Sequence, residues 1–433
     1  MTMIGGQPLG CPPFFMEKKK LKILCSPANE GGCSYYRLIA PMKKMQQLYG
    51  DQVEFRYNLN PLGIVEDVNL LTKEGANKGR WQEDWDYADM KWADIVWCNN
   101  ISNWGGPYTA RIVGKAKEFG KFVHFDTDDL LTDLYEGHRL YKVYKERNLE
   151  EITKFIYQNA DLVTVTQRKF AERIKPYCRG VLAVVKNAID YELPCWNIPK
   201  VPPPKKNLIR IGWAGGIHHE EDVKEFAGIP HLVNGRVGRE NVHWGFYGAP
   251  LLKKDEDGNP QEDWQHEVWR NYKRILLRGF KGAPNWNIYN ALSPDSYGGL
   301  YSNVDISIAP LQMNAFNDSK SEIKVAECGR YKIPLIASDV GCYDETIVNG
   351  KTGYLISPSA PKSEWVKVFT KCLKNPGHVR EMGNNLHKIT EEYFDLSKVV
   401  KHRLELYEQA LGLLHGDQPD EKVSYNSEWE FDA

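Results

Sequence analysis

The segment from Asn303 to Leu355 decides the fold of this chain; it reads NVDISIAP LQMNAFNDSK SEIKVAECGR YKIPLIASDV GCYDETIVNG KTGYL. Residues 304–309 form a short apolar run that ends at Pro310, which is typical of a buried parallel strand. Residues 333–337 form a second run of this kind. We therefore expect two neighbouring strands of one sheet, joined by a crossover.

The sequence between these two strands predicts a polar loop followed by a helix. Ser319 and Ser321 are both N-cap candidates, and the helix that follows would carry Lys324 and Glu327 in its first two turns. A strand, a capped helix and a strand form a βαβ unit. Such units bind anions at the helix N-terminus, so this segment is also the first candidate binding site.

Strand-like apolar runs alternate with helical patterns along most of the chain, which predicts an α/β protein with helices on both faces of parallel sheets. Residues 199–206 contain four prolines, which weaken sheet pairing and stiffen the chain, so we expect an interdomain linker there. The expected parts are a disordered extension (1–19), an N-terminal domain (20–198), a C-terminal domain (207–395) with a loop insertion at 251–270, and an acidic tail (415–433).

The composition is that of a globular enzyme and excludes several other classes of protein. Lys and Arg total 56 against 57 Asp and Glu in 433 residues, so bulk charge does not favour a nucleic-acid or membrane partner. The nine cysteines are scattered without zinc-site spacing, which favours a reduced intracellular chain. No apolar run reaches the ~18–20 residues of a membrane span, and the N-terminus lacks a signal-peptide pattern. We therefore expect a cytoplasmic protein.

The first strand is followed by a glycine turn, Gly31-Gly32-Cys33-Ser34-Tyr35-Tyr36-Arg37. Glycines let the backbone approach a ligand closely, and the start of the next helix offers free N–H groups. This position in a doubly wound sheet is a common ligand crevice. A plain βα turn is the alternative interpretation.

Three carboxylates follow the strand at 122–125 in the sequence Asp126-Thr127-Asp128-Asp129. Because like charges repel, such a cluster indicates that something cationic or hydrogen-bonding compensates it. A divalent metal site, a carboxylate that faces the substrate, and a helix N-cap are all compatible with the pattern. We favour Asp128 or Asp129 as a catalytic group, with Asp126 as a further candidate.

A second glycine loop, Gly212-Trp213-Ala-Gly215-Gly216-Ile-His-His219-Glu-Glu-Asp222, follows the first strand of the second half. Adjacent histidines point apart, so His218 and His219 make a poor metal pair. In the N-terminal half, Trp104 lies in a glycine-rich loop after a strand and is a candidate for contact with a substrate.

The order of these pieces resembles the donor site of nucleotide-sugar glycosyltransferases of the GT-B fold. More narrowly it resembles the large retaining family, glycosyltransferase group 1 or family 4-like, among its bacterial or phage members. Members carry two glutamates with seven residues between them. Glu327 matches the second glutamate, whereas the first falls at Ser319. The chain is instead similar to a subgroup with the pattern Phe316, Asn317, Lys320, Ser321, Lys324 and Glu327.

The resemblance implies two Rossmann-like domains that face each other across a cleft, with a last helix (396–414) that returns to the N-terminal domain. It implies that Glu327 binds the ribose of a nucleotide-diphosphate sugar, beside Asn317 and Ser321. The phosphates would then contact Lys320, Lys324 and the two glycine loops, with His219 nearby. Tyr35 and Arg37 would belong to the phosphate or acceptor loop.

No cofactor is expected beyond this donor, and Mg²⁺ is not expected to be essential. The acceptor would be a glycan or a small molecule, with a modified DNA base as the alternative, since some phage enzymes of this fold glycosylate DNA. Two other functions stay open. One is a nucleotide-sugar 2-epimerase, and the other is a degenerate sugar-nucleotide-binding protein.

Overall fold

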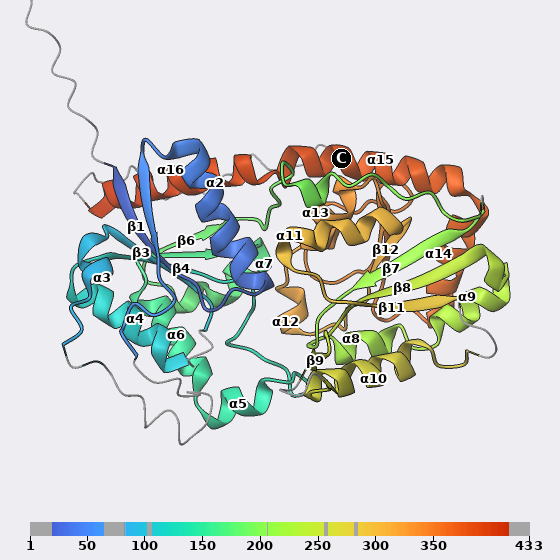
Figure 1. Ribbon diagram of the computed structural model, residues 1–433, viewed down its shortest axis with the longest axis horizontal. Helices are drawn as coiled ribbons and strands as arrows, with labels where there is room; N and C mark the ends of the chain where they lie inside the picture. The colour runs from blue at the N-terminus through green and yellow to red at the C-terminus, as the bar shows by residue number, and fades with distance from the viewer. Residues whose placement is uncertain are drawn as a thin grey trace, which may run out of the picture.

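The computed structural model describes residues 20–64, 82, 84–101, 106–205, 207–254, 259–280 and 285–414. It contains two parallel six-stranded sheets, one in each half of the chain, with helices packed around both (Figure 1). The α/β, doubly wound architecture predicted from the sequence is confirmed. The expected N-terminal extension, the acidic tail and Trp104 lie outside the described residues.

The N-terminal sheet has the strand order β2-β1-β3-β4-β5-β6, and every neighbouring pair is parallel. Its central strands β3 and β4 are buried along their whole length, as expected for a sheet covered on both faces. The strands are β1 Leu21–Ser26, β2 Val53–Tyr57, β3 Ile95–Asn99, β4 Phe122–Asp126, β5 Leu162–Val165 and β6 Val181–Val184.

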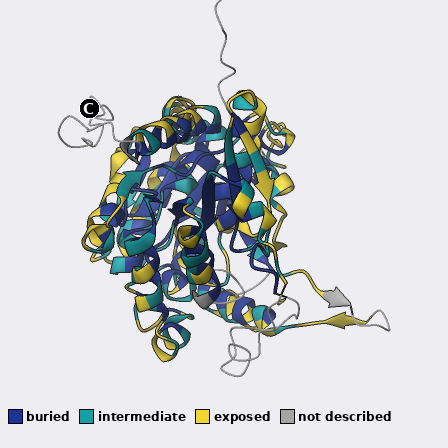
Figure 2. Cartoon of the chain, turned by 90° about the vertical axis from the view of Figure 1, so that its left-hand side faces the viewer, coloured by how far each residue is buried: buried dark blue, intermediate teal, exposed yellow. Residues whose placement is uncertain are grey.

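The helices of this unit lie on both sides of the sheet, and their apolar faces form the cores shown in dark blue in Figure 2. A π-helical turn, η1, lies between the first two α-helical segments. The helical segments are α1 Gly32–Ser34, η1 Tyr35–Ile39, α2 Ala40–Tyr49, α3 Ala88–Trp92, α4 Gly106–Glu118, α5 Tyr141–Glu146, α6 Leu149–Asn159, α7 Arg168–Ile174, η3 Lys175–Tyr177 and η4 Pro194–Trp196.

The C-terminal sheet has the order β11-β8-β7-β12-β13-β14, again with parallel neighbours throughout. This is the Rossmann order, in which the direction of winding reverses between β7 and β12. The strands are β7 Ile209–Ala214, β8 Val242–Ala249, β11 Trp286–Asn290, β12 Ile306–Ala309, β13 Leu335–Ser338 and β14 Gly353–Ile356, with a small antiparallel pair β9 Lys253–Lys254 and β10 Pro260–Gln261.

The helices of the C-terminal half include one that the sequence prediction missed. Part of the predicted loop insertion at 251–270 is the start of α10, which Asp263 and His266 cap reciprocally. The helical segments are α8 Glu220–Glu225, α9 Ile229–Val237, η5 Arg239–Asn241, α10 Trp264–Leu276, α11 Pro294–Tyr297, η6 Gly298–Asn303, α12 Ala315–Asp318, α13 Ile323–Arg330, η7 Tyr343–Glu345, α14 Lys362–Lys374, α15 Pro376–Tyr393 and α16 Leu396–Leu414.

The last described helix, α16, lies on the N-terminal unit although it follows the C-terminal sheet in the chain (Figure 1). Leu396, Val400, Leu404 and Tyr407 are buried there against residues of β1 and β3 such as Ile23 and Trp97. The chain thus crosses between the two units twice. Among the described helices, none is long and apolar enough to cross a membrane.

Candidate active site

In each sheet a glycine turn follows the strand at which the strand order reverses, the position where doubly wound sheets usually bind ligands. In the C-terminal unit, β7 is followed by Gly215 and Gly216. A Cβ on Gly215 would lie 2.3 Å from the Trp213 ring, so Gly215 is required for packing. A Cβ on Gly216 would meet nothing within 4 Å. Gly216 therefore borders open space, where a ligand could approach the backbone.

In the N-terminal glycine turn, too, one glycine is closely packed and the other borders open space. Gly31 is the N-cap of α1, and a Cβ there would lie 2.9 Å from the amide oxygen of Asn29. A Cβ on Gly32 would again meet nothing within 4 Å. The backbone at Gly32 is thus open to a ligand at the carboxyl end of β1.

Glu327, the predicted ribose ligand, lies on α13 and is 2% exposed. Its Oε2 accepts hydrogen bonds from the Tyr301 hydroxyl and the Lys324 ammonium, both at 2.6 Å. Its Oε1 accepts one from the Tyr36 hydroxyl at 3.3 Å. Tyr36 belongs to the N-terminal unit, so Glu327 lies at the junction of the two units.

The two lysines predicted to bind phosphate have different surroundings. The Lys324 ammonium is bound to Glu327 and to the Tyr297 hydroxyl (2.8 Å), and the Glu327 charge helps to raise the pKa of Lys324 well above its usual range despite burial, which opposes the shift. Lys324 is therefore paired with the glutamate, and its contact with phosphate stays a prediction. The Lys320 ammonium lies 5.0 Å from the centre of the Phe316 ring and makes no hydrogen bond within the described part of the chain.

The Lys320 charge acts on titratable groups of both units, so it lies near His219 of the C-terminal unit and Asp129 of the N-terminal unit. With burial as the main cause, its charge helps to lower the pKa of His219. It also opposes the rise in the pKa of Asp129, in the N-terminal unit. A lone cation in this position can bind an anionic ligand.

His219 is held by a buried hydrogen-bond network. This network includes Asn317, which was also predicted to bind the nucleotide sugar. The Asp222 carboxylate accepts a hydrogen bond from the His219 ring (2.7 Å), the Gln312 N–H (2.9 Å) and the Asn317 side chain (2.8 Å). Asp222 and Asn317 are each 1% exposed. Asn317 therefore supports the site from behind instead of facing a ligand, while Asp222 fixes the histidine ring.

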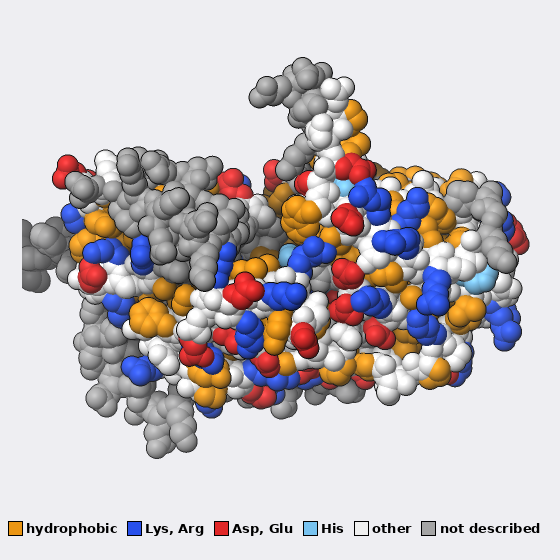
Figure 3. All heavy atoms as spheres, turned by 90° about the horizontal axis from the view of Figure 1, so that it is seen from below, with side chains coloured by type: hydrophobic (Ala, Val, Ile, Leu, Met, Phe, Trp, Pro, Cys, Tyr) orange, Lys and Arg blue, Asp and Glu red, His pale blue; other side chains and the backbone are white. Residues whose placement is uncertain are grey.

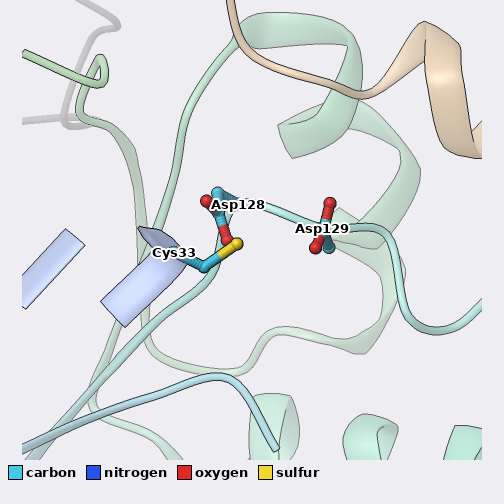
Figure 4. Close-up of side chains that lie close together, drawn as sticks. All are labelled: Cys33, Asp128 and Asp129. Atoms are coloured by element: carbon cyan, nitrogen blue, oxygen red, sulfur yellow. The ribbon is translucent and has the colours of Figure 1, made fainter. Parts of the chain in front are cut away.

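Asp128 and Asp129 lie in the loop after β4 and face Cys33 of the first glycine turn (Figure 4). The two carboxylates and the Cys33 thiol have ligand atoms within 4.8 Å of one another. Burial and the neighbouring Asp128 raise the pKa of Asp129 to about 7. The Asn100 side chain donates to Asp128 at 3.1 Å. One carboxyl of this pair can therefore carry a proton near neutral pH, as acid–base chemistry requires.

This trio could in principle hold a metal ion, but its donor atoms fit Mg²⁺ poorly. Magnesium prefers six oxygen ligands in octahedral geometry, whereas the trio offers two carboxylates and a soft thiol. It is the only group of three candidate ligands found among the described residues.

Two predicted site residues, Asp126 and Arg37, form a buried ion pair, so their assignment to the site is wrong. Arg37 and Arg403 bind the two oxygens of Asp126 at 2.5 and 2.6 Å, and all three side chains are at most 1% exposed. Arg37 also donates to the Val185 carbonyl and the Asn187 side chain. Asp126 and Arg37 are thus neutralised within a buried cluster with Arg403 and do not face the site.

The predicted helix cap at Ser319 or Ser321 is also wrong. The helix α13 begins at Ile323, with Glu322 at the N-cap. Ser319 is fully buried and donates to the Ala315 carbonyl, so the position of the family's first glutamate cannot contact a sugar. Ser321 accepts a hydrogen bond from Asn187 at 2.8 Å and joins the two units.

Tyr35, the remaining residue of the predicted phosphate or acceptor loop, is half-buried and lies edge-on to Tyr36, with ring centres 5.7 Å apart. Burial raises the pKa of Tyr35 to about 12. Its phenol is therefore neutral at physiological pH.

Several contacts that close the units on each other were not predicted. Gln167 and Arg173, beside and on α7, bind Asp318 in the segment that precedes Lys320 (2.7 and 2.8 Å). His138 of the N-terminal unit stacks on His218, with ring centres 5.7 Å apart and an angle of 8°. These pairs are 80 or more residues apart in the chain, so no local pattern could have revealed them.

Comparisons with known proteins match part of the C-terminal half to a family model and most of the chain to solved structures. Residues 282–389 match the family model described as glycosyl transferases group 1. No curated protein matches the chain. Among solved structures, sucrose-phosphate synthase from Thermosynechococcus elongatus is similar, with 13% identity, a TM-score of 0.63, and coverage of 91% of this chain and 100% of that one.

Two further structures have the same overall architecture. Anabaena Alr3699/HepE in complex with UDP-glucose has 13% identity, a TM-score of 0.56, and coverage of 90% of this chain and 100% of that chain. A glycosyltransferase from Rickettsia africae has 13% identity and a TM-score of 0.53, with coverage of 90% and 99%. At this identity the likeness establishes the fold, which is GT-B as predicted.

Proposed function

We propose that this chain, a GT-B glycosyltransferase with a group 1 glycosyltransferase domain, transfers a sugar from a nucleoside-diphosphate sugar to an acceptor hydroxyl with retention of configuration. The observation that carries the proposal is the convergence of Glu327, Lys320, His219 and the two open glycine turns between the units. These are groups that recognise ribose, diphosphate and sugar. The Anabaena protein of the same fold was solved with UDP-glucose, which makes UDP the first nucleotide to test.

In the proposed donor complex, a ribose hydroxyl donates to Oε1 of Glu327, since Oε2 already accepts two short hydrogen bonds. The diphosphate lies between Lys320 and the N–H groups at Gly216 and Gly32. When the bond between the anomeric carbon and the phosphate oxygen breaks, its electron pair leaves with the diphosphate. The Lys320 charge stabilises that negative charge while the sugar has oxocarbenium character.

Asp128 and Asp129 contribute on the acceptor side of the cleft. The acceptor oxygen forms the new bond to the anomeric carbon and releases its proton. We assign this proton to the Asp128–Asp129 pair, because the raised pKa of Asp129, about 7, suits a general base near neutral pH. Retention follows from the resemblance to the retaining family.

We propose a glycan or small-molecule hydroxyl as the acceptor rather than duplex DNA. DNA binding is dominated by Lys and Arg contacts to phosphates, which require a basic face. On the face shown in Figure 3, Lys and Arg side chains are interspersed with Asp and Glu. The chain as a whole has a formal net charge of −1.

The test is a transfer assay with a panel of UDP-, GDP- and ADP-sugars and hydroxyl acceptors, read by nucleotide release and by NMR of the product's anomeric proton. The proposal predicts an acceptor-dependent product with the anomeric configuration of the donor. Asp128→Asn and Asp129→Asn should spare donor binding and lower turnover. Wild-type turnover in both variants would remove these carboxylates from the chemistry, and conversion of the donor without acceptor would indicate an epimerase instead.

A further inference from the structure

The two oxygens of the Glu327 carboxylate are unequally occupied. Oε2 accepts two hydrogen bonds of 2.6 Å, from Tyr301 and Lys324. Oε1 accepts one, from Tyr36, and its length of 3.3 Å exceeds the 2.5–3.0 Å of ordinary O–H···O bonds. A carboxylate oxygen has about two acceptor sites, so Oε2 is filled and only Oε1 can serve a further hydroxyl.

The hydroxyl now on Oε1 comes from the other half of the protein. Tyr36 lies in η1 of the N-terminal unit and packs against the apolar cluster around Tyr301, Val325 and Tyr331 in the C-terminal unit. Burial, followed by the charge of Glu327, raises the pKa of Tyr36 well above its usual range, so the phenol keeps its proton and acts as a donor. A ribose hydroxyl is also a neutral donor of this kind.

We infer that the Tyr36 hydroxyl and a ribose hydroxyl of the nucleotide compete for Oε1 of Glu327, so that Tyr36 is a positioning residue that couples donor binding to the N-terminal unit. This inference rests on the proposed function, since it requires Glu327 to bind ribose. The Glu327 carboxylate is 2% exposed and already contacts the Tyr36 and Tyr301 hydroxyls and the Lys324 ammonium. Oε1 has a second acceptor site, but so little of the carboxylate faces solvent that entry of the ribose must displace the group on the weakest of the three bonds, Tyr36.

Tyr36 and Tyr301 provide matched variants for the test, which is calorimetric titration of the full chain with UDP, GDP and ADP. Tyr36→Phe removes the competing hydroxyl and should bind the preferred nucleotide about 2–5 times more tightly. Tyr301→Phe removes a hydroxyl from the other oxygen, where no competition occurs, and should not bind more tightly. Either the 2′-hydroxyl or the 3′-hydroxyl of the ribose reaches Oε1. The deoxy nucleotide that lacks this hydroxyl should bind the wild type and Tyr36→Phe equally tightly.

The outcomes separate this inference from the proposed function. Unchanged or weaker binding by Tyr36→Phe, or a gain that persists with both deoxy nucleotides, would overturn the inference while leaving nucleotide binding intact. If the wild-type chain binds none of the three nucleotides, or if Glu327→Gln binds as tightly as wild type, the proposed donor site itself is wrong.

Discussion

Arg403 of the last described helix donates a hydrogen bond to Asp126 at 2.6 Å, although 277 residues separate them in the chain. Arg37 binds the other oxygen of the same carboxylate, and the Arg403 guanidinium lies 4.7 Å from the centre of the Trp97 ring. Burial opposes ionisation of Asp126, yet the charges of Arg37 and Arg403 hold its pKa below the usual value. The triad thus fixes helix α16 to the strand that leads into the Asp128–Asp129 loop.

Replacing Arg403 should destabilise the protein strongly. Arg403→Met leaves a buried carboxylate with one partner fewer, and breaking a buried ion pair in this way costs about 3–5 kcal/mol. Urea unfolding followed by circular dichroism measures the change. Lys401→Met is the matched control on the same helix, because the Lys401 side chain is 68% exposed and should cost less than about 1 kcal/mol. Equal losses in the two variants would contradict the structural role of the triad.

Asp129 should make the stability of the protein depend on pH. Its pKa is about 7 in the folded protein and about 4 in the unfolded chain. The folded state therefore binds more protons between these values, so this group lowers stability as pH rises from about 4 to about 7. Asp129→Asn removes this loss of stability. The melting temperature of the variant minus that of the wild type should therefore increase from pH 5 to pH 8. The exposed Asp133→Asn should show a constant difference over the same range.

The stacked histidines should act in the opposite direction. Burial, then the charges of His218 and Lys320, lower the pKa of His138 to about 4, whereas a histidine in the unfolded chain titrates near 6.5. The unfolded state binds the extra proton, so stability is lost as pH falls from about 6.5 towards 4. His138→Gln should reduce the drop in melting temperature between pH 7.5 and pH 5. The exposed His231→Gln serves as control, and an unchanged drop in His138→Gln would contradict this assignment.

Lys320 should bind the diphosphate and not the nucleoside. A charge-assisted hydrogen bond contributes about 1.5–3 kcal/mol, so Lys320→Ala should weaken binding of UDP about 10- to 150-fold and leave binding of uridine unchanged. Lys351→Ala, at an exposed turn before β14, should change neither. Equal losses for UDP and uridine would show that Lys320 supports the site indirectly.

The architecture could be predicted from the sequence because local patterns of apolar residues and glycines indicate most of its strands, helices and turns. Apolar runs such as residues 304–309 contain buried strands, and the last helix that the resemblance implied, 396–414, matches α16. The glycine turns at Gly31 and Gly215 were found because they follow strands at fixed positions in a doubly wound sheet. The antiparallel pair β9–β10 and helix α10 were missed, since their charged sequence resembles a loop.

The assignment of individual side chains required three dimensions. Asp126 and Asp128 are two residues apart and look alike in sequence, but Asp126 still belongs to the buried strand β4, whereas Asp128 lies in the loop beyond it. Lys320 and Lys324 also look alike in sequence. In the structure, the Lys324 ammonium binds Glu327 and Tyr297, whereas the Lys320 ammonium makes no hydrogen bond within the described residues. The pairing of Tyr36 with Glu327 spans 291 residues and has no local pattern at all.

The central claim is that Glu327 holds the ribose of a nucleotide between the two units, and a calorimetric titration with UDP tests it most directly. We predict that the wild-type chain binds UDP and that Glu327→Ala and Glu327→Gln each weaken binding by about 1–3 kcal/mol, or roughly 5- to 150-fold. The glutamine variant guards against misfolding, since it keeps the shape of a side chain that is 2% exposed. Unchanged affinity in a folded Glu327→Gln variant would contradict the account.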